Sequence, residues 1–302
     1  MINKYSKEFI NDEKKGYMFV LPALLFMMIF IGYPIIYNFV LSFQDVNVMT
    51  LSQSIKTFVG LKNYIDLFKD PTMWLSIWNT FIFTLGSISI QFIMGLCLAL
   101  FFNLKFKIAE FIRGLMVISY MIPVTVTALL FQFMYSKDNG VINELLLRFH
   151  LISQPIGWIV NERTAMLSVI IANVWIGIPF NMLLLTTGLS NIPYSIYEAA
   201  KVDGANAFQR FFYITLPQLR AAILAVLMLG FIYTFKVFDL VFVMTNGGPV
   251  NATELMSTFA YRLSFSEFLF SKGASVANIL FLILFIVSLF YLRLLKEDEV
   301  MQ

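Results

Sequence analysis

The chain has 302 residues, of which 59% are apolar, 17% are aromatic and only 13% are charged, and its formal net charge is +3. Soluble domains carry about 25% charged residues and at most about half apolar residues, so a soluble globular fold, a disordered chain and a coiled coil are all excluded. The small net charge gives no reason to expect nucleic-acid binding. The composition therefore predicts a protein embedded in membrane lipid.

Six stretches between charged residues are long enough to cross a bilayer. A crossing helix needs about 20 apolar residues, and an unpaired charge at the bilayer centre costs several kcal/mol. Because long apolar runs without alternation satisfy their backbone groups as helices, we expect an all-α membrane domain over 16–293, between tails at 1–15 and 294–302. The expected spans are 16–44, 73–103, 114–136, 165–189, 221–245 and 274–293.

The first span follows a basic N-terminus but is too long for a cleaved signal, and it lacks a small-residue cleavage site. We therefore expect a retained anchor. With both ends inside, the inner segments carry 12 Lys and Arg residues and the longer outer segments carry 8. This bias predicts that both termini are cytoplasmic.

The segment between the fourth and fifth spans has the signals of two short helices joined by a turn. Pro193 suits the first turn of a helix, with Ser190 or Asn191 as its cap. Gly204 suits a left-handed stop, and Asn206 can cap the second helix, whose phenylalanines we expect to pack against the spans. The sequence therefore predicts a helix–turn–helix on the inner membrane surface.

This segment, 190–220, resembles the EAA loop of binding-protein-dependent ABC importer permeases. The family pattern is Glu-Ala-Ala, three residues, Gly, nine residues, Ile, one residue, Leu-Pro. The chain matches it without a gap at Glu198, Ala199, Ala200, Gly204, Ile214, Leu216 and Pro217. The alternative is an amphipathic connector with a coincidental match.

The resemblance implies the type I ABC importer permease fold, with six transmembrane helices and a coupling helix that docks on a separate ATPase subunit. The expected ATPase-coupling residues are Glu198, Ala199, Ala200, Asp203 and Gly204. Glu198 could instead pair locally with Lys201, three residues further along the helix. No phosphate-binding GxxxxGK[ST] loop occurs anywhere in the sequence, so we expect ATP and Mg²⁺ on partner subunits and no cofactor on this chain.

Three further stretches resemble the carbohydrate branch of this family, in the shorter six-span form of the maltose-, lactose- and glycerol-phosphate-type permeases. They are the LP…YP…SF pattern of Leu21–Phe43, the GLKNY lead-in at Gly60–Tyr64, and the segment from Phe238 to Glu254. The last contains an extracellular loop motif, Gly247-Gly248-Pro249, whose alternative interpretation is an ordinary surface turn.

A sugar pathway needs polar groups and aromatic faces turned inward. Asn173, Gly177 and Phe180 recur at i, i+4 and i+7 and so share one helix face, although Asn173 could instead bond a neighbouring backbone and Gly177 could mark a close helix crossing. The resemblance supports Tyr120 before a proline, and Tyr233 and Thr234. The expected pathway residues are Tyr120, Asn173, Ile176, Gly177, Phe180, Tyr233 and Thr234. Gln91, Gln132 and Asn181 are polar candidates without such support.

Lys236 and Asp239 lie within the expected fifth span, at i and i+3 of one helix, near its outer end. They could bind an acidic sugar, but we favour a structural ion pair, which reduces the cost of placing both charges in lipid. One cysteine, Cys97, and one histidine, His150, give no basis for a disulfide or a metal site.

Together these features predict a non-enzymatic permease subunit in a bacterial cell membrane. Its expected partners are a second homologous permease in a heterodimer, two ABC ATPase subunits and an extracellular solute-binding protein. The substrate would be a sugar, oligosaccharide or polyol phosphate, moved by alternating access. The alternatives are an ion-coupled secondary transporter, for which only Lys236 and Asp239 are available, and a membrane-embedded transferase, for which the spans hold no carboxylate cluster.

Overall fold

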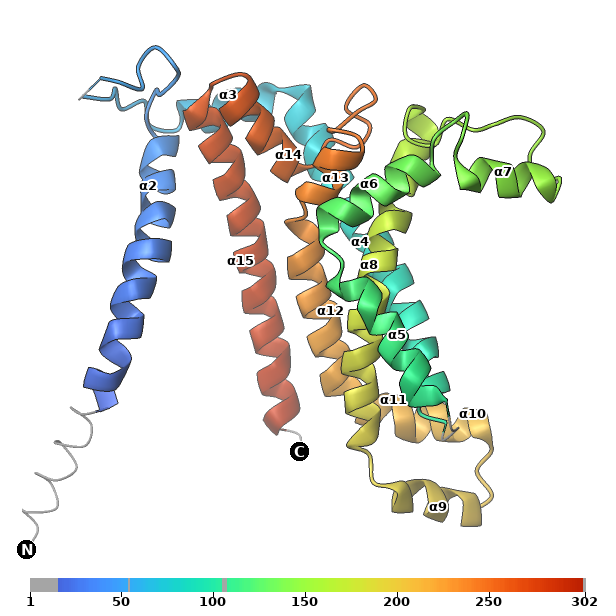
Figure 1. The fold of residues 1–302 in the computed structure, drawn as a ribbon. Coiled ribbons are helices and arrows are strands. Elements are labelled where there is room, and N and C mark those ends of the chain that lie inside the picture. Colours follow the sequence, from blue (N-terminus) through green and yellow to red (C-terminus); the bar gives the residue numbers. More distant parts are fainter. Residues whose placement is uncertain (1–15, 54, 105–107, 301–302) are drawn as a thin grey trace, which may run out of the picture.

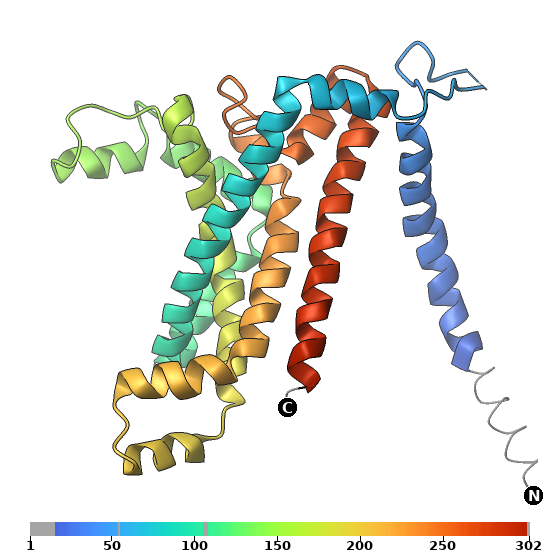
Figure 2. The ribbon, with the colours of Figure 1, turned by 180° about the vertical axis from the view of Figure 1, so that it is seen from behind.

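The protein is a bundle of long helices, with short helices at both ends (Figures 1 and 2). The structure, a computed structural model, describes residues 16–53, 55–104 and 108–300, so the expected tail at 1–15 lies outside the described residues. Apart from one isolated bridge between Gln44 and Phe58, the described residues hold no β-structure. The all-helical prediction is confirmed.

The described chain begins with a helical stretch over residues 16–27, after which seventeen further helical elements follow one another. They are η1 (Met28–Gly32), α2 (Tyr33–Ser42), α3 (Lys62–Lys69), α4 (Pro71–Phe102), α5 (Ala109–Met121), α6 (Val124–Met134), α7 (Val141–Arg148), α8 (Glu162–Ser190), α9 (Tyr194–Val202), α10 (Ala207–Arg210), η2 (Phe211–Thr215), α11 (Leu216–Gln218), α12 (Arg220–Phe235), α13 (Asp239–Met244), α14 (Met256–Tyr261), η3 (Arg262–Ser266) and α15 (Phe270–Val300). The η elements are π-helical. We call the end of the bundle that carries α9 the α9 end.

Four helices in the described residues are long and apolar enough to cross a membrane: Gly16–Ser42, Pro71–Phe102, Glu162–Ser190 and Phe270–Leu294. Two further pairs pass the same test together but are bent, Ala109–Met121 with Val124–Met134 by 94° and Ala207–Gln218 with Arg220–Phe235 by 64°. If each bent pair is one span, the number rises to six.

The expected third and fifth spans are not single helices. The third breaks at Ile122, whose backbone is extended, because Pro123 disfavours helical geometry at the residue before it. The fifth was expected to run to 245, but α12 ends at Phe235 and α13 begins at Asp239. There the carbonyl of Val237 accepts a hydrogen bond from the Ser257 hydroxyl, so a tertiary contact satisfies a group that a continuous helix would have used. At the far end, α15 continues into the expected tail as far as Val300.

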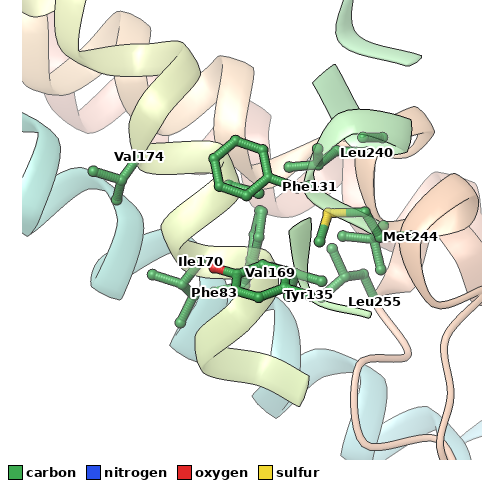
Figure 3. Close-up of a cluster of buried hydrophobic side chains, with 12 residues drawn as sticks. Phe83, Phe131, Tyr135, Val169, Ile170, Val174, Leu240, Met244 and Leu255 are labelled. Atoms are coloured by element: carbon green, nitrogen blue, oxygen red, sulfur yellow. The ribbon is translucent and has the colours of Figure 1, made fainter. Parts of the chain in front are cut away.

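The centre of the bundle is the crossing of α4 and α8. A Cβ atom on Gly95 would lie 2.5 Å from the Cβ of Asn181, so this pair of helices can approach as closely as it does only because Gly95 has no side chain. Figure 3 shows the largest apolar cluster, in which Phe83, Phe131 and Val169 from α4, α6 and α8 meet Leu240 of α13. The contacts of α13 explain why the chain turns back toward the bundle after α12.

The first span stands apart from this core. Asn38 donates to the side chain of Asn278 at 2.6 Å and to the carbonyl of Ala274 at 3.3 Å, both on α15. Asn63, from the GLKNY stretch, donates to the carbonyls of Ser42 and Gln44 at 2.8 Å each and so secures the end of this span. Toward the α9 end the helix diverges from α15, and none of its most apolar 18-residue window is buried (Figures 1 and 2).

Candidate functional site

An aromatic cluster joins three helices that are far apart in the sequence. The ring of Tyr120 on α5 stacks on Phe180 of α8 with 6.0 Å between centroids, and Phe180 meets the edge of Tyr233 on α12 at 6.2 Å. The break at Ile122–Pro123 places Tyr120 at the last turn of α5, where the chain turns away from the bundle axis. Aromatic faces of this kind stack against the C–H faces of sugar rings.

These rings line a cavity of about 290 Å³ between α4, α5, α8 and α12. All seven expected pathway residues line it. The lining residues are Gln91, Tyr120, Val124, Asn173, Ile176, Gly177, Phe180, Asn181, Gly230, Tyr233, Thr234, Lys236, Val237 and Asp239. Gln91 and Asn181, two candidates without family support, are therefore at the cavity as well. Val124, Gly230 and Val237 were not predicted, because an apolar or small residue in a span carries no signal of its own.

Asn173 brings a buried polar group with unused hydrogen-bonding capacity to the cavity. Its side chain is 6% exposed, and its amide nitrogen has no hydrogen-bond partner in the described residues. The alternative interpretation, in which the Asn173 amide nitrogen donates to a neighbouring backbone carbonyl, is therefore not observed. The Asn173 backbone carbonyl instead accepts from the Gln91 side chain at 2.9 Å. A buried unpaired donor costs about 1–3 kcal/mol, so a ligand oxygen there would be stabilising.

Gly177 serves close packing as well as the cavity surface. A Cβ atom at this position would lie 2.2 Å from Cδ of Gln91, so the glycine makes room for the Gln91 side chain. Nearby, the Asn181 amide donates to the Gly177 carbonyl at 2.8 Å. The polar side chains of Gln91 and Asn181 thus fasten backbone groups, whereas the amide of Asn173 remains available.

Lys236 and Asp239 do not form the expected ion pair, which is a correction to the sequence interpretation. Because α12 ends at Phe235, the two residues are not on one helix, and no salt bridge joins them in the described structure. The Lys236 ammonium lies 5.4 Å from the centroid of the Tyr233 ring, in a cation–π contact. Both charged residues line the cavity.

A helix–turn–helix forms at the α9 end. After α9, Gly204 has φ +81°, its N–H bonds the Lys201 carbonyl at 3.1 Å, and the Ala205 N–H bonds the Ala200 carbonyl at 2.9 Å. This is a Schellman motif, which requires a left-handed residue and so favours glycine. Asn206 and Gln209 then form a capping box at the start of α10, which confirms the predicted cap at Asn206.

Two expectations for this unit are wrong. Pro193 is itself the N-cap of α9, and neither Ser190 nor Asn191 caps it; the Ser190 hydroxyl instead bonds the Thr186 carbonyl at 2.9 Å. Phe208 and Phe212 are 77% and 55% exposed and do not pack against the spans, whereas Phe211 is half-buried. A hydrogen bond of 3.0 Å between the hydroxyls of Tyr197 and Thr215 joins α9 to η2, and Tyr197 also packs against the buried cluster that includes Leu189 and Leu219.

The EAA residues face outward from the bundle. Glu198, Ala199, Asp203 and Gly204 are exposed, and Ala200 is half-buried. The local alternative for Glu198 is not seen, since among the described residues no salt bridge joins Glu198 to Lys201. The Lys201 ammonium lies 5.8 Å from the Tyr194 ring centroid. The Glu198 carboxylate is therefore free to meet another protein.

The Gly247-Gly248-Pro249 motif is not an ordinary surface turn. Gly247 has φ +81°, and a Cβ atom there would lie 2.9 Å from a carboxylate oxygen of Glu254. Thr253 donates to the Gly248 carbonyl at 2.7 Å, and the Gly248–Pro249 peptide bond is cis. The loop thus folds tightly around Glu254.

Glu254 is the buried charge at the centre of this loop, with 2% exposure. It accepts from the Thr258 hydroxyl at 2.6 Å and from Arg262 Nε at 3.0 Å. Its pKa is raised above the ordinary value because the cost of burial outweighs the stabilising effect of these two donors. Asn79 on α4 donates to the carbonyls of Asn251 and Glu254, at 3.0 and 3.2 Å, and so fixes the loop to the bundle.

Comparisons with known proteins bear on this arrangement. Residues 91–298 match the family described as "Binding-protein-dependent transport system inner membrane component". The trehalose/maltose transport system permease protein MalF of Thermococcus litoralis is 32% identical over 292 residues, covering 96% of this chain and 97% of that protein. The lactose transport system permease protein LacF of Rhizobium radiobacter is 34% identical, with 95% and 96% coverage. A chain in the crystal structure of a bacterial ABC transporter that imports the acidic polysaccharide alginate has a TM-score of 0.81 at 21% identity, with 97% and 99% coverage.

Proposed function

Because the chain belongs to the family of binding-protein-dependent transport system inner membrane components, we propose that it is one permease subunit of an ATP-driven sugar importer in a bacterial cell membrane. Its similarity to permeases named for trehalose/maltose and lactose transport supports a sugar, oligosaccharide or polyol phosphate as substrate. Proteins of this kind are transport components rather than enzymes. Family membership also argues against the ion-coupled transporter and the membrane transferase.

The cavity is the proposed passage for the sugar. Tyr120, Phe180 and Tyr233 offer ring faces, and the Asn173 amide offers a buried donor for a hydroxyl oxygen. Because α5, α8 and α12 each contribute one ring, a relative movement of these helices would take the aromatic surface apart. A site built this way is suited to alternating access, in which the substrate is held in one arrangement and released in another.

The exposed EAA face is the proposed contact with an ATPase subunit. Glu198 has no salt-bridge partner among the described residues, and the Schellman turn at Gly204 and the capping box at Asn206 hold the two short helices in a fixed relation. A rigid unit of this kind can transmit a push from one protein to the spans. ATP and Mg²⁺ would be bound by the ATPase subunits and not by this chain.

The other proposed partners are a second permease and a solute-binding protein. The first span has a wholly exposed apolar window, a surface that a second permease in a heterodimer could cover. With the α9 end in the cytoplasm, both chain termini are cytoplasmic, and the loop around Glu254 faces the binding protein outside. Six spans, counting each bent pair as one, are consistent with this orientation.

The experiment is sugar uptake by the complete transporter, with its own ATPase, second permease and binding protein, in proteoliposomes. Glu198→Lys should abolish uptake and sugar-stimulated ATP hydrolysis while the subunit still inserts and assembles. Glu110→Lys is a matched control, because Glu110 is also an exposed acid near the α9 end, at the start of α5. Full uptake by the Glu198→Lys variant would contradict the proposed role of Glu198 in coupling. Uptake in the absence of ATP would contradict the proposal that the transporter is ATP-driven.

A further inference from the structure

The helix α7, between the third and fourth expected spans, projects sideways from the bundle. Figures 1 and 2 both place it outside the long helices, at the end opposite α9, with the loop that follows it rising above it. Its eight residues, Val141–Arg148, run across the direction of α8. A helix in this position lies either in water, against a partner protein, or along the membrane surface.

Asn143 holds α7 firmly to its own loop. This side chain is 3% exposed, and its amide donates to the carbonyl of Ile156 at 2.9 Å. Its oxygen accepts from the Ile156 N–H at 3.1 Å and from the Trp158 indole at 2.9 Å. On the same side, Ile142 packs against the main apolar cluster. The orientation of α7 about its axis is therefore set, and so is the surface that it presents.

The presented surface is divided into an apolar stripe and a charged stripe. Val141, Leu145 and Phe149 follow one another at four-residue spacing and are 43%, 48% and 72% exposed. Beside them, Glu144 and Arg148 form an exposed i,i+4 ion pair at 3.4 Å. Leu151, 69% exposed, extends the apolar stripe beyond the helix. An exposed apolar stripe beside a charged one is the pattern of a helix that lies in a membrane interface.

The apolar stripe is close in the chain to another exposed apolar surface, on a helix that belongs to an expected span. Helix α6, the second half of a bent pair that passes the membrane test, exposes Leu129, Leu130 and Phe133 by 55%, 50% and 67%. Only six residues separate α6 from α7, and both helices extend in the same direction from the bundle (Figures 1 and 2). Helices α6 and α7 thus extend from the same end of the bundle, and both carry exposed apolar side chains.

We propose that α7 lies in the outer membrane–water interface, with Val141, Leu145, Phe149 and Leu151 inserted among the lipids and the Glu144–Arg148 pair turned to water. That this is the outer interface rests on the proposed function, which puts the α9 end in the cytoplasm. The insertion of α7 into an interface does not depend on the proposed function. Insertion of α7 would fix the depth of the segment that joins α6 to α7. The α5–α6 break beside the cavity is at the other end of α6, so its depth would be fixed as well.

Spin labels can test this in the complete transporter, reconstituted in lipid nanodiscs. Single cysteines would be introduced at Phe149, Leu145 and Glu144 in a Cys97→Ala background, each labelled with a nitroxide. Collisions with oxygen, which concentrates in lipid, are compared with collisions with a water-soluble nickel chelate. Glu144 is the matched control, because it lies on the same helix and is also exposed.

Labels at Phe149 and Leu145 should collide severalfold more with oxygen than with nickel, and the label at Glu144 should show the reverse. A nickel preference at Phe149 would overturn the proposal by placing the stripe in water. Low collision rates with both reagents would also overturn it, because a protein partner would then cover the stripe. Sugar uptake by each labelled complex is measured separately, so a failed insertion test leaves the importer assignment intact, and the reverse holds as well.

Discussion

The loop around Glu254 allows a sharp prediction, because two glycines with the same positive φ lie in different surroundings. Gly204 and Gly247 both have φ +81°. A Cβ atom at Gly204 would meet nothing within 4 Å, whereas at Gly247 it would lie 2.9 Å from a carboxylate oxygen of Glu254. Alanine would meet the same left-handed φ at both positions, so the difference between the two variants reports mainly the contact with Glu254.

The expected magnitudes follow from these contacts. A side chain in the left-handed region costs about 1–2 kcal/mol, so Gly204→Ala should destabilise by that amount. At Gly247 the carboxylate must also move, which breaks its bonds to Arg262 and Thr258, and hydrogen bonds to charged groups contribute about 1.5–3 kcal/mol. The strain and the loss of even one such bond together give about 2.5–5 kcal/mol, so we expect Gly247→Ala to destabilise by at least about 2.5 kcal/mol.

The assay is the melting temperature of the purified complex in nanodiscs, followed by intrinsic fluorescence. Gly247→Ala should melt well below Gly204→Ala, and both should melt below the unmodified protein. Glu254→Ala serves as a second comparison, because adding Gly247→Ala to it should cost no more than Gly204→Ala alone. Equal melting temperatures for the two single glycine variants would refute the inference that Glu254 fixes the loop.

Four other outcomes can be checked with the same complex. Asn173→Ala should weaken sugar binding about tenfold, the equivalent of about 1.4 kcal/mol for one lost hydrogen bond, while basal ATP hydrolysis is unchanged; an unaltered concentration dependence of uptake would contradict the cavity assignment. Gly177→Ala should be destabilising because Gln91 must leave the Asn173 carbonyl, and the penalty should shrink in a Gln91→Ala background, as a double-mutant cycle of melting temperatures would show. Lys236→Met should leave uptake of a neutral sugar intact; if uptake of every sugar is lost, Lys236 is needed for more than an acidic substrate. Asn206→Ala should loosen α10 by about 1 kcal/mol, seen as faster amide exchange over 206–215, and unchanged exchange would mean that the capping box is not needed there.

The sequence alone determined the environment, the helical class and the family. A chain with long apolar runs and only 13% charged residues cannot fold as a soluble protein. In lipid, the helix is one of the few structures that satisfy every backbone N–H and C=O group. The helix–turn–helix also depends on local signals. The turn at Gly204 and the cap at Asn206 are each determined by residues within a few positions, so the sequence predicted both. Family resemblance and, on α8, helical spacing selected the seven expected pathway residues, which line one cavity; their role in transport stays a prediction.

Only the tertiary structure decided where helices break and which polar groups are already paired. Hydropathy averages over about 20 residues and so did not register the end of α12 at Phe235, which depends on contacts of the following segment with α14 and the core. That break separates Lys236 from Asp239, two residues that on a continuous helix would have been neighbours. Likewise, Gln91, Asn173 and Asn181 look alike as polar residues in apolar spans. The Gln91 bond joins α4 to α8 and so depends on the distance between two helices, whereas the Asn181 amide bonds the Gly177 carbonyl within its own helix. The Asn173 amide nitrogen has neither kind of partner among the described residues.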